Sequence, residues 1–304
     1  MPELPEVESL VRLLRPHLVN QIIAAYEMPK RLRGGIQMAE LIGQTITGLE
    51  RCAKLVLLET GKATAVFHLM LNGQFILIPV GNGTRLAGGH PAPDMLDELP
   101  GKTTRLILHL ASGSRLYLND SRNFASVELI PPNSLELLRS RHRYGPDPLS
   151  TDFTDVYLQS ILARRPRSTI KEVLLDQSVA PGIGNICADE SLFLAGIHPA
   201  TSAADLGEVE VARLMKGITE TLEAGIRRGG SANEARPSVK ETRLAQQQVF
   251  NVYSRKGMRC LRCGATIERT VIGGRGTHYC PKCQPLISTG LRQDTVRSMP
   301  KYSQ

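Results

Sequence analysis

Hydrophobic positions through roughly the first 130 residues alternate with polar ones or form short continuous runs, which is typical of strands in a packed sandwich or flattened barrel. Strands are expected within residues 21–28, 44–59, 63–80 and 104–118. Asn72-Gly73 and Ser112-Gly113 are the expected hairpin turns. Residues 81–94 have the composition of a loop.

From about residue 151 the apolar spacing becomes helical and stays so to about residue 228. Helices are expected within residues 156–164, 168–177, 185–196 and 206–228. The fold class is therefore α+β, because strands come first and helices follow. We expect five parts: a β-sandwich domain at 1–133, a linker at 134–150, a helical domain at 151–248, a cysteine-bearing segment at 249–284 and a tail at 285–304.

Composition adds little to this picture except for charge. The chain has 304 residues, 41% of them hydrophobic, which is enough for a substantial core. Its formal net charge is +8 and its pI about 9.3, a weak indication of nucleic-acid binding that many soluble proteins share. No basic-then-apolar leader and no apolar run approaching 18 residues is present, so we expect a cytoplasmic protein without a membrane span.

Four of the six cysteines form two Cys-x-x-Cys pairs with 16 residues between them: Cys260, Cys263, Cys280 and Cys283. Two such pairs can supply four thiolates to one tetrahedral Zn²⁺. The intervening residues predict a strand, a Gly-Gly turn and a second strand, hence a zinc-held β-hairpin with Arg275 at its tip. A redox role for one pair is disfavoured because both pairs are present. Arg275 is either simply solvated or a phosphate clamp.

The chain begins MPELPEVESL, which predicts a helix. Pro5 suits its first turn, and Glu6 and Glu8 suit the positive end of its dipole. Its apolar stripe is Val7, Leu10, Val11 and Leu14. Residue preferences at a helix start explain Pro5 but not Pro2. If the initiator Met is removed, Pro2 carries a free secondary amine, a nucleophile, and Glu3 lies beside it.

Further motifs combine positive charge with candidate DNA contacts. Gly182-Ile-Gly184-Asn185 can hold a phosphate at a helix N-terminus or simply begin the helix, and Arg165 adds charge nearby. Strand alternation puts Lys54 on the same face as Cys52, either at a site or as an edge lysine that blunts aggregation. Arg122 and Phe124 share a face, where they either fill a gap in a base stack or pack in the protein.

In combination these motifs resemble the formamidopyrimidine-DNA glycosylase / endonuclease VIII family of bifunctional DNA repair enzymes. The match runs from MPELPEVE through Lys54, HLMLNG, DSRNF and IGNICADESLFLAGIHP to RKGMRCLRC…GGRGTHYCPKCQ. It covers nearly the whole chain except residues 229–247 and the tail. Leu4 resembles the formamidopyrimidine branch, because the endonuclease VIII branch typically has Gly at this position.

The resemblance implies a two-domain clamp with a helix–two-turn–helix motif, one structural Zn²⁺, and damaged double-stranded DNA in the cleft of a monomeric, bacterial, nucleoid-associated enzyme. It implies excision of the damaged base together with DNA-(apurinic or apyrimidinic site) lyase activity. In this mechanism Pro2 would attack C1′ and form a Schiff base, which leads to β,δ-elimination. Glu3 would act as the general acid/base. Lys54 would contact a phosphate and move a proton, and Arg275 would grip phosphates. Implied substrate and DNA contacts are Glu6 at the base, and His68, Leu71, Arg122, Phe124, Arg165, Lys171 and Asn185.

Four positions depart from the branch. Leu71 replaces the usual Met, Thr103 a DNA-contacting His, and Pro181 a small residue. Residues 229–247 lack the Asp-Gly…Gly-aromatic pattern of the loop that covers an oxidised purine. The resemblance implies formamidopyrimidines and 8-oxoguanine as the lesions, and the departures leave oxidised pyrimidines or another lesion as the alternative. A non-catalytic zinc-dependent DNA-binding protein, or a small-molecule enzyme with a structural zinc, are alternatives from other classes.

Overall fold

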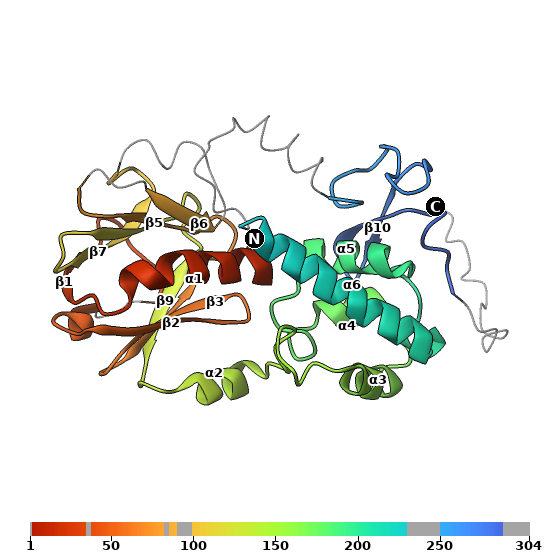
Figure 1. Ribbon diagram of the computed structural model, residues 1–304, viewed down its shortest axis with the longest axis horizontal. Helices are drawn as coiled ribbons and strands as arrows, with labels where there is room; N and C mark the ends of the chain where they lie inside the picture. Colours follow the sequence, from red (N-terminus) through yellow and green to blue (C-terminus); the bar gives the residue numbers. More distant parts are fainter. Residues whose placement is uncertain (1, 35–37, 82–84, 90–98, 230–249, 288–304) are drawn as a thin grey trace, which may run out of the picture.

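The computed structural model describes residues 2–34, 38–81, 85–89, 99–229 and 250–287, and it forms two lobes that lie side by side (Figure 1). One lobe is a β-sandwich, and the other is helical and carries a β-hairpin near its C-terminal end. Helix α1 (Leu4–Leu18) lies along the sandwich with its first turn at the junction of the lobes. The expected α+β fold class is confirmed.

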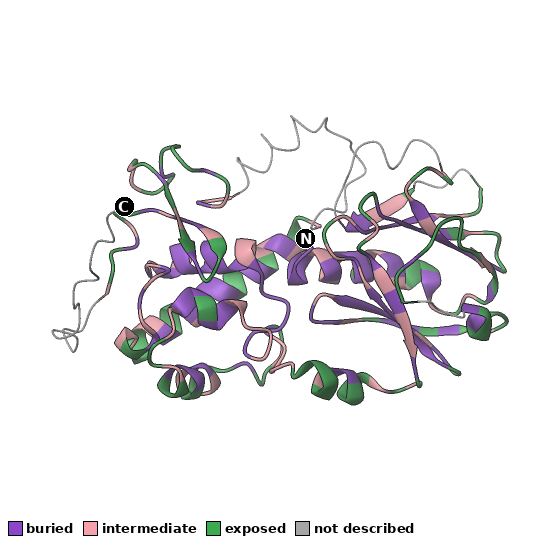
Figure 2. Ribbon diagram, turned by 180° about the vertical axis from the view of Figure 1, so that it is seen from behind, coloured by how far each residue is buried: buried purple, intermediate pink, exposed green. Residues whose placement is uncertain are grey.

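Two antiparallel sheets make up the sandwich. Its described strands are β1 (Ile23–Glu27), β2 (Ile46–Cys52), β3 (Leu55–Thr60), β4 (Thr64–His68), β5 (Gln74–Ile78), β6 (Leu86–Gly89), β7 (Thr104–Leu110), β8 (Arg115–Asn119) and β9 (Ser126–Ile130). Their orders are β1-β7-β8-β5-β6 in one sheet and β2-β3-β4-β9 in the other. Helix α1 contacts β2 of one sheet and β6 of the other, and Val7, Leu10 and Leu14 are buried in the core that both sheets share. Figure 2 shows buried positions, in purple, along strands of the sandwich and along helices of the other lobe.

Several local predictions for the sandwich are corrected. Ser112-Gly113 does join the hairpin β7–β8. Asn72-Gly73 does not, because β4 and β5 belong to different sheets and the turn carries the chain from one sheet to the other. The expected loop at 81–94 contains β6, which pairs with β5. The expected linker at 134–150 contains a helix, α2 (Leu135–His142), and a short 3₁₀ helix, η1 (Met38–Leu41), follows β1.

The helical lobe contains the four helices that the apolar spacing predicts. They are α3 (Asp155–Arg164), α4 (Ile170–Leu175), α5 (Asn185–Ala195) and α6 (Glu208–Arg227), with a 3₁₀ turn, η3 (Ala203–Asp205), before the last. Leu4 of α1 belongs to the core of this lobe, and its N–H donates to the carbonyl of Gly182 at 3.0 Å. The first turn of α1 therefore joins the two lobes.

The cysteine-bearing segment forms the expected hairpin, with β10 (Glu268–Ile272) antiparallel to β11 (Arg275–Tyr279) around Gly273-Gly274. It packs on α5, because Phe193 shares a buried cluster with Val252 and Ile267. Residues 230–249 and 288–304, which include most of the departing loop and the tail, lie outside the described residues. Among the described helices none is long and apolar enough to cross a membrane.

Candidate active site

Glu3 links the start of the chain to the start of α5. Its carboxylate is 4% exposed and accepts backbone N–H groups from Gly184 at 3.1 Å, Ile186 at 2.9 Å and Cys187 at 2.9 Å. A helix N-terminus favours an anion, because its first amides lack partners within the helix and the dipole is positive there. Pro2 is also buried at this junction. The two residues that the sequence singled out therefore lie where the lobes meet.

The loop before α5 approaches Glu3 so closely that it requires glycine. A Cβ on Gly184 would lie well under 3.0 Å from the Glu3 carboxyl group, a distance that real Cβ contacts essentially never show. Gly182 has φ +93°, and a Cβ there would be 2.8 Å from the Cβ of Leu4. The GIG motif thus allows the backbone to close over the first turn of α1, a role different from the phosphate loop that its spacing suggested.

Lys54 reaches the same loop from the sandwich. It lies in the two-residue turn between β2 and β3, so the prediction from strand alternation is wrong. Its Nζ donates to the carbonyl of Ile183 at 3.0 Å, and Gln177 Nε2 donates to the same oxygen at 3.0 Å. Burial lowers the pKa of Lys54; the charge of Arg275 lowers it further and that of Glu3 opposes the change.

Arg51 is a residue that the sequence reasoning left without a role. Its side chain is 6% exposed and pairs with Glu8 of α1 and with Asp147, both at 2.8 Å. Its Nη1 also donates to the carbonyl of Ala53, at 3.2 Å. Ala53 has φ +53°, a strained value for a residue with a Cβ, so Arg51 helps to hold the turn that carries Lys54.

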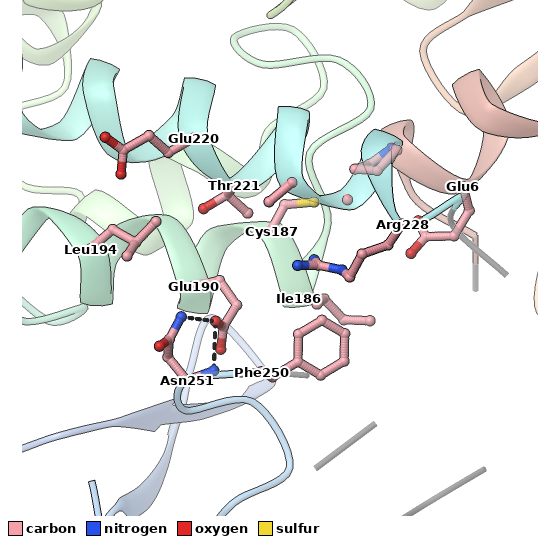
Figure 3. A pocket seen from close by; sticks show the side chains of 13 residues that line it. Glu6, Ile186, Cys187, Glu190, Leu194, Glu220, Thr221, Arg228, Phe250 and Asn251 are labelled. Carbon is pink, nitrogen blue, oxygen red and sulfur yellow. Dashed lines mark hydrogen bonds between the residues drawn. The ribbon is translucent and has the colours of Figure 1, made fainter. Parts of the chain in front are cut away.

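Glu6 lies beside Glu3 and lines a small cavity. Its Oε2 accepts the Glu3 N–H at 2.9 Å, and burial followed by the charge of Glu3 raises the pKa of Glu6. The cavity has a volume of about 60 Å³ and lies between α1, α5, α6 and residues 250–251. Figure 3 shows the Cys187 and Thr221 side chains between α5 and α6, with Arg228 and Phe250 toward the Glu6 end. The Thr221 hydroxyl is buried without a hydrogen-bond partner among the described residues.

Lys171 is placed differently from the prediction. Its side chain is 0% exposed and its Nζ donates to Asp189 Oδ1 at 2.5 Å and to Thr277 Oγ1 at 2.8 Å. A direct contact with DNA would require Lys171 to leave these partners, so that contact stays a prediction. Asp189 is likewise fully buried and accepts the His278 N–H at 2.9 Å. A lysine near a helix start is usually solvated, and the partner of Lys171 lies 18 residues further along the chain. The local sequence pattern therefore did not predict that Lys171 is buried.

Two predicted contacts are already paired with protein groups. The Asn185 Nδ2 donates to the carbonyl of Gly276 at 2.8 Å, beside the exposed Arg275 at the hairpin tip. Arg165 forms an ion pair with Asp176. Their contacts with DNA stay predictions, and Arg165 would have to keep or exchange its partner.

The residues expected to enter the base stack lie on two joined turns of the sandwich. Leu71 and Phe124 are 38% and 39% exposed, and Arg122 is exposed. Asn72 Nδ2 donates to Ser121 Oγ at 3.1 Å, which connects the two turns. The buried carboxylate of Asp120 accepts the N–H groups that shape the second turn: those of Arg122, Phe124 and Ala125. His68, at the end of β4, is half-buried, and burial lowers its pKa.

The four cysteines fit a structural zinc ion. Their Sγ atoms all lie within 4.8 Å of one another, with Cys260 and Cys283 at 3.9 Å and Cys263 and Cys280 at 3.5 Å. Four thiolates at the usual Zn–S distance in a tetrahedron are about 3.8 Å apart. The donor set and its geometry therefore agree with one tetrahedral Zn²⁺ at the base of the hairpin.

The sequence matches three family profiles, in the order of the parts described above. These are the Formamidopyrimidine-DNA glycosylase N-terminal domain over residues 1–127, the Formamidopyrimidine-DNA glycosylase H2TH domain over residues 144–236, and the zinc finger found in FPG and IleRS over residues 257–286. Formamidopyrimidine-DNA glycosylases of a Roseiflexus species and of Brevibacillus brevis are 38% and 35% identical to this chain over 291 residues. Each alignment covers 93% of this chain, and 100% and 99% of the respective relative.

Solved structures of the Lactococcus lactis formamidopyrimidine-DNA glycosylase have a similar fold. One, bound non-covalently to DNA with an abasic site, has a TM-score of 0.77 at 32% identity and covers 93% of this chain and 99% of its own. Another, in complex with DNA that contains a formamidopyrimidine lesion of deoxyguanosine, has a TM-score of 0.77 at 31% identity and covers 93% and 100%.

Proposed function

The chain belongs to the formamidopyrimidine-DNA glycosylase family, and we propose that it is a bifunctional glycosylase and abasic-site lyase acting through a Schiff base at Pro2. The observation that carries this proposal is the convergence on one junction of Pro2, Glu3 and Lys54 from separate parts of the fold. A protein that only binds DNA would not need the amine of a buried Pro2 beside the Glu3 carboxylate, which three backbone amides hold in place.

The covalent step begins at the Pro2 nitrogen once Met1 is removed. An α-amino group has an unperturbed pKa near 8, so a substantial fraction is neutral and nucleophilic at pH 7. The nitrogen lone pair forms a bond to C1′, and the bond from C1′ to the base breaks with its electron pair leaving on the base, which takes up a proton from water. Because C1′ is unreachable in a stacked duplex, the damaged nucleotide must flip out first.

Glu3 moves the proton that this step releases. Its carboxylate, held as an acceptor by three amides, takes the proton from the Pro2 nitrogen and delivers it to O4′ as the C1′–O4′ bond breaks. The nitrogen lone pair then completes an iminium ion, which is permanently cationic because the amine is secondary. That cation accepts electron density as a C2′ proton leaves and the 3′ phosphate departs; a second elimination releases the 5′ phosphate.

Positive groups around the junction hold the DNA backbone in this proposal. Lys54, close enough to Arg275 and Glu3 to respond to their charges, contacts a phosphate and supplies a proton in the eliminations. Arg275 projects from the exposed hairpin tip and pairs with phosphates flanking the flipped nucleotide. His68 and Asn185 add backbone contacts. Leu71, Arg122 and Phe124, on their joined turns, fill the space that the base leaves.

The cavity beside Glu6 receives the flipped base. Glu6 and the Thr221 hydroxyl, which is buried without a hydrogen-bond partner among the described residues, are two of the polar groups that line it and can hydrogen-bond to a base. A volume of about 60 Å³ holds only a few water molecules, so the cavity must widen to admit a base. We propose formamidopyrimidines and 8-oxoguanine as the lesions, removed by a monomer in the bacterial cytoplasm.

Borohydride trapping on a panel of lesion duplexes tests the proposal. The wild-type protein should give a covalent, reduced adduct with a formamidopyrimidine duplex. Pro2→Gly should abolish or severely slow excision while DNA affinity stays within roughly threefold, because the phosphate contacts are unchanged. A version with a blocked N-terminus should behave alike. Normal excision and trapping by the blocked protein would refute the Schiff base at Pro2, and a panel dominated by oxidised pyrimidines would replace the proposed lesion class.

A further inference from the structure

We propose that Lys171 is a positioning residue, which sets the place of Arg275 through a buried ion pair with Asp189 instead of contacting DNA. The inference rests on the proposed function only where it assigns Arg275 a phosphate contact. The geometry itself concerns how the zinc hairpin is attached to the helical lobe, and it can be tested without DNA.

The three residues that follow Arg275 are all held by groups of the helical lobe. The Gly276 carbonyl accepts from Asn185 at 2.8 Å and from Lys171 Nζ at 3.4 Å. The Thr277 hydroxyl accepts from Lys171 at 2.8 Å. The His278 N–H donates to Asp189 at 2.9 Å. The attachment therefore runs through β11, directly beside the tip arginine.

Lys171 and Asp189 form an ion pair at the centre of this attachment. Both side chains are 0% exposed, so neither charge is satisfied by solvent. Lys171 comes from the first turn of α4 and Asp189 from α5, and each has one bond to the other and at least one to the hairpin. Removal of the lysine leaves the buried carboxylate with only the His278 ring nitrogen, at 3.4 Å, as a possible ion-pair partner, which is an unfavourable state that repacking must relieve.

The tip depends on this attachment because the zinc ion lies at the other end of the hairpin. Cys280 directly follows β11, and Cys260 and Cys263 precede β10, whereas Arg275 begins β11 at the turn. Strand β10 is largely exposed, with Val271 60% exposed, so it contributes little to docking. Gly273 and Gly274, at φ +55° and +73°, form a turn that gives the tip no side-chain packing of its own.

Hydrogen exchange of the β11 amides tests the positioning directly. We expect Lys171→Met to speed exchange at Thr277 and His278 at least tenfold while zinc content stays at one ion per chain. The matched control is Lys216→Met, since Lys216 is 78% exposed on α6. If Lys171→Met fails to fold, Lys171→Met/Asp189→Leu removes both buried charges and serves instead. Unchanged exchange in a folded, zinc-loaded variant would overturn the inference.

A double-mutant cycle on a duplex containing a tetrahydrofuran abasic analogue then separates positioning from direct contact. Arg275→Ala should lower affinity and reduce the salt slope by about 0.9, the value for one phosphate contact. Lys171→Met should do the same, and the double variant should match Arg275→Ala alone. Losses that multiply would show an independent DNA contact by Lys171 and refute positioning. An unchanged slope in Arg275→Ala would instead refute the proposed role of Arg275, and the exchange result would still decide how the hairpin is held.

Discussion

Gly184→Ala tests whether excision depends on the fit between Glu3 and α5. The added Cβ would lie well under 3.0 Å from the Glu3 carboxyl group, so either that side chain or the start of α5 must move. The Glu3 backbone is itself fixed, because Leu4 donates to Gly182 and the first turn of α1 is buried. We therefore expect the carboxylate to be displaced and at least one of its three amide partners to be lost.

The consequences for stability and for rate should differ in size. Overpacking a tight site costs about 1–3 kcal/mol, and replacing glycine by alanine returns about 0.4–1 kcal/mol through the unfolded chain. The net loss in free energy of unfolding is then roughly 1–2 kcal/mol, small beside a typical domain stability of about 5–15 kcal/mol. A catalytic group misplaced by about 1 Å can cost on the order of a hundredfold in rate.

The assay is single-turnover excision of a formamidopyrimidine opposite cytosine, with incision of a preformed abasic site measured beside it. Excision should fall about a hundredfold. Abasic incision should fall much less, because no base must leave and the open aldehyde needs no proton at O4′. Gly61→Ala is the control, since a Cβ there meets nothing within 4 Å. Excision by Gly184→Ala within threefold of wild type, with the fold intact, would show that the position of Glu3 does not limit the reaction.

Three further predictions follow from the contacts around the junction. Arg51→Met should lower the free energy of unfolding by roughly 2 kcal/mol, discounted from the buried-pair value because Glu8 and Asp147 are partly exposed. Burial alone would raise the pKa of Glu8, but the hydrogen bonds from Arg51 and Arg12 lower it. The stabilisation from this ion pair is therefore present above the ordinary pKa of 4.5 and is lost as pH falls through the folded pKa of Glu8. Urea unfolding curves of the variant and the wild type should then converge in acid. Lys54→Met should remove an alkaline limb from the rate of abasic incision, because burial makes wild-type Lys54 lose its proton below the ordinary 10.5; an identical limb in the variant would assign it to another group. Cys260→Ser should lose zinc, measured by metal analysis, and weaken DNA binding while the near-ultraviolet signal of the sandwich persists; full zinc in the variant would exclude the four-cysteine site.

The four helices of the helical lobe and most strands followed from local pattern, because each depends on which face of a segment is buried, whereas α2, β6 and β9 were not predicted. The errors arose where distant residues decide the structure. Asn72-Gly73 has a turn sequence, but pairing across the whole sandwich decides that β4 and β5 belong to different sheets. The turn at Ala53-Lys54 contains no glycine or asparagine, the residues that usually predict such a turn. Ala53 has a positive φ there, and Arg51, fixed by ion pairs with Glu8 and Asp147, helps to hold it. Strand alternation could not have found that turn.

The candidate site divides in the same way. Pro2, Glu3 and the four cysteines could be identified because their chemistry or their spacing is unusual by itself. The contact of Glu3 with α5, about 180 residues away in sequence, could not, since nothing in either segment specifies the other. The same holds for Lys171, whose burial is decided by Asp189 and the zinc hairpin together. Local sequence indicates the candidate reacting groups, and tertiary contacts determine their positions.

Helix α5 provides the common frame for these placements. Its N-terminus holds Glu3, while its buried Asp189 and Glu190 hold β11 and residues 251–253. The Glu3 carboxylate, to which the proposed function assigns the proton transfer, and the hairpin that carries Arg275 are thus fixed to one 11-residue helix. Leu71 and Thr103, where the sequence is expected to depart from the usual residues of the branch, belong to the sandwich lobe. Under the proposed function, a change at these two positions would leave the contacts of Glu3 and β11 with α5 in place, so the lesion preference could differ without loss of the chemistry.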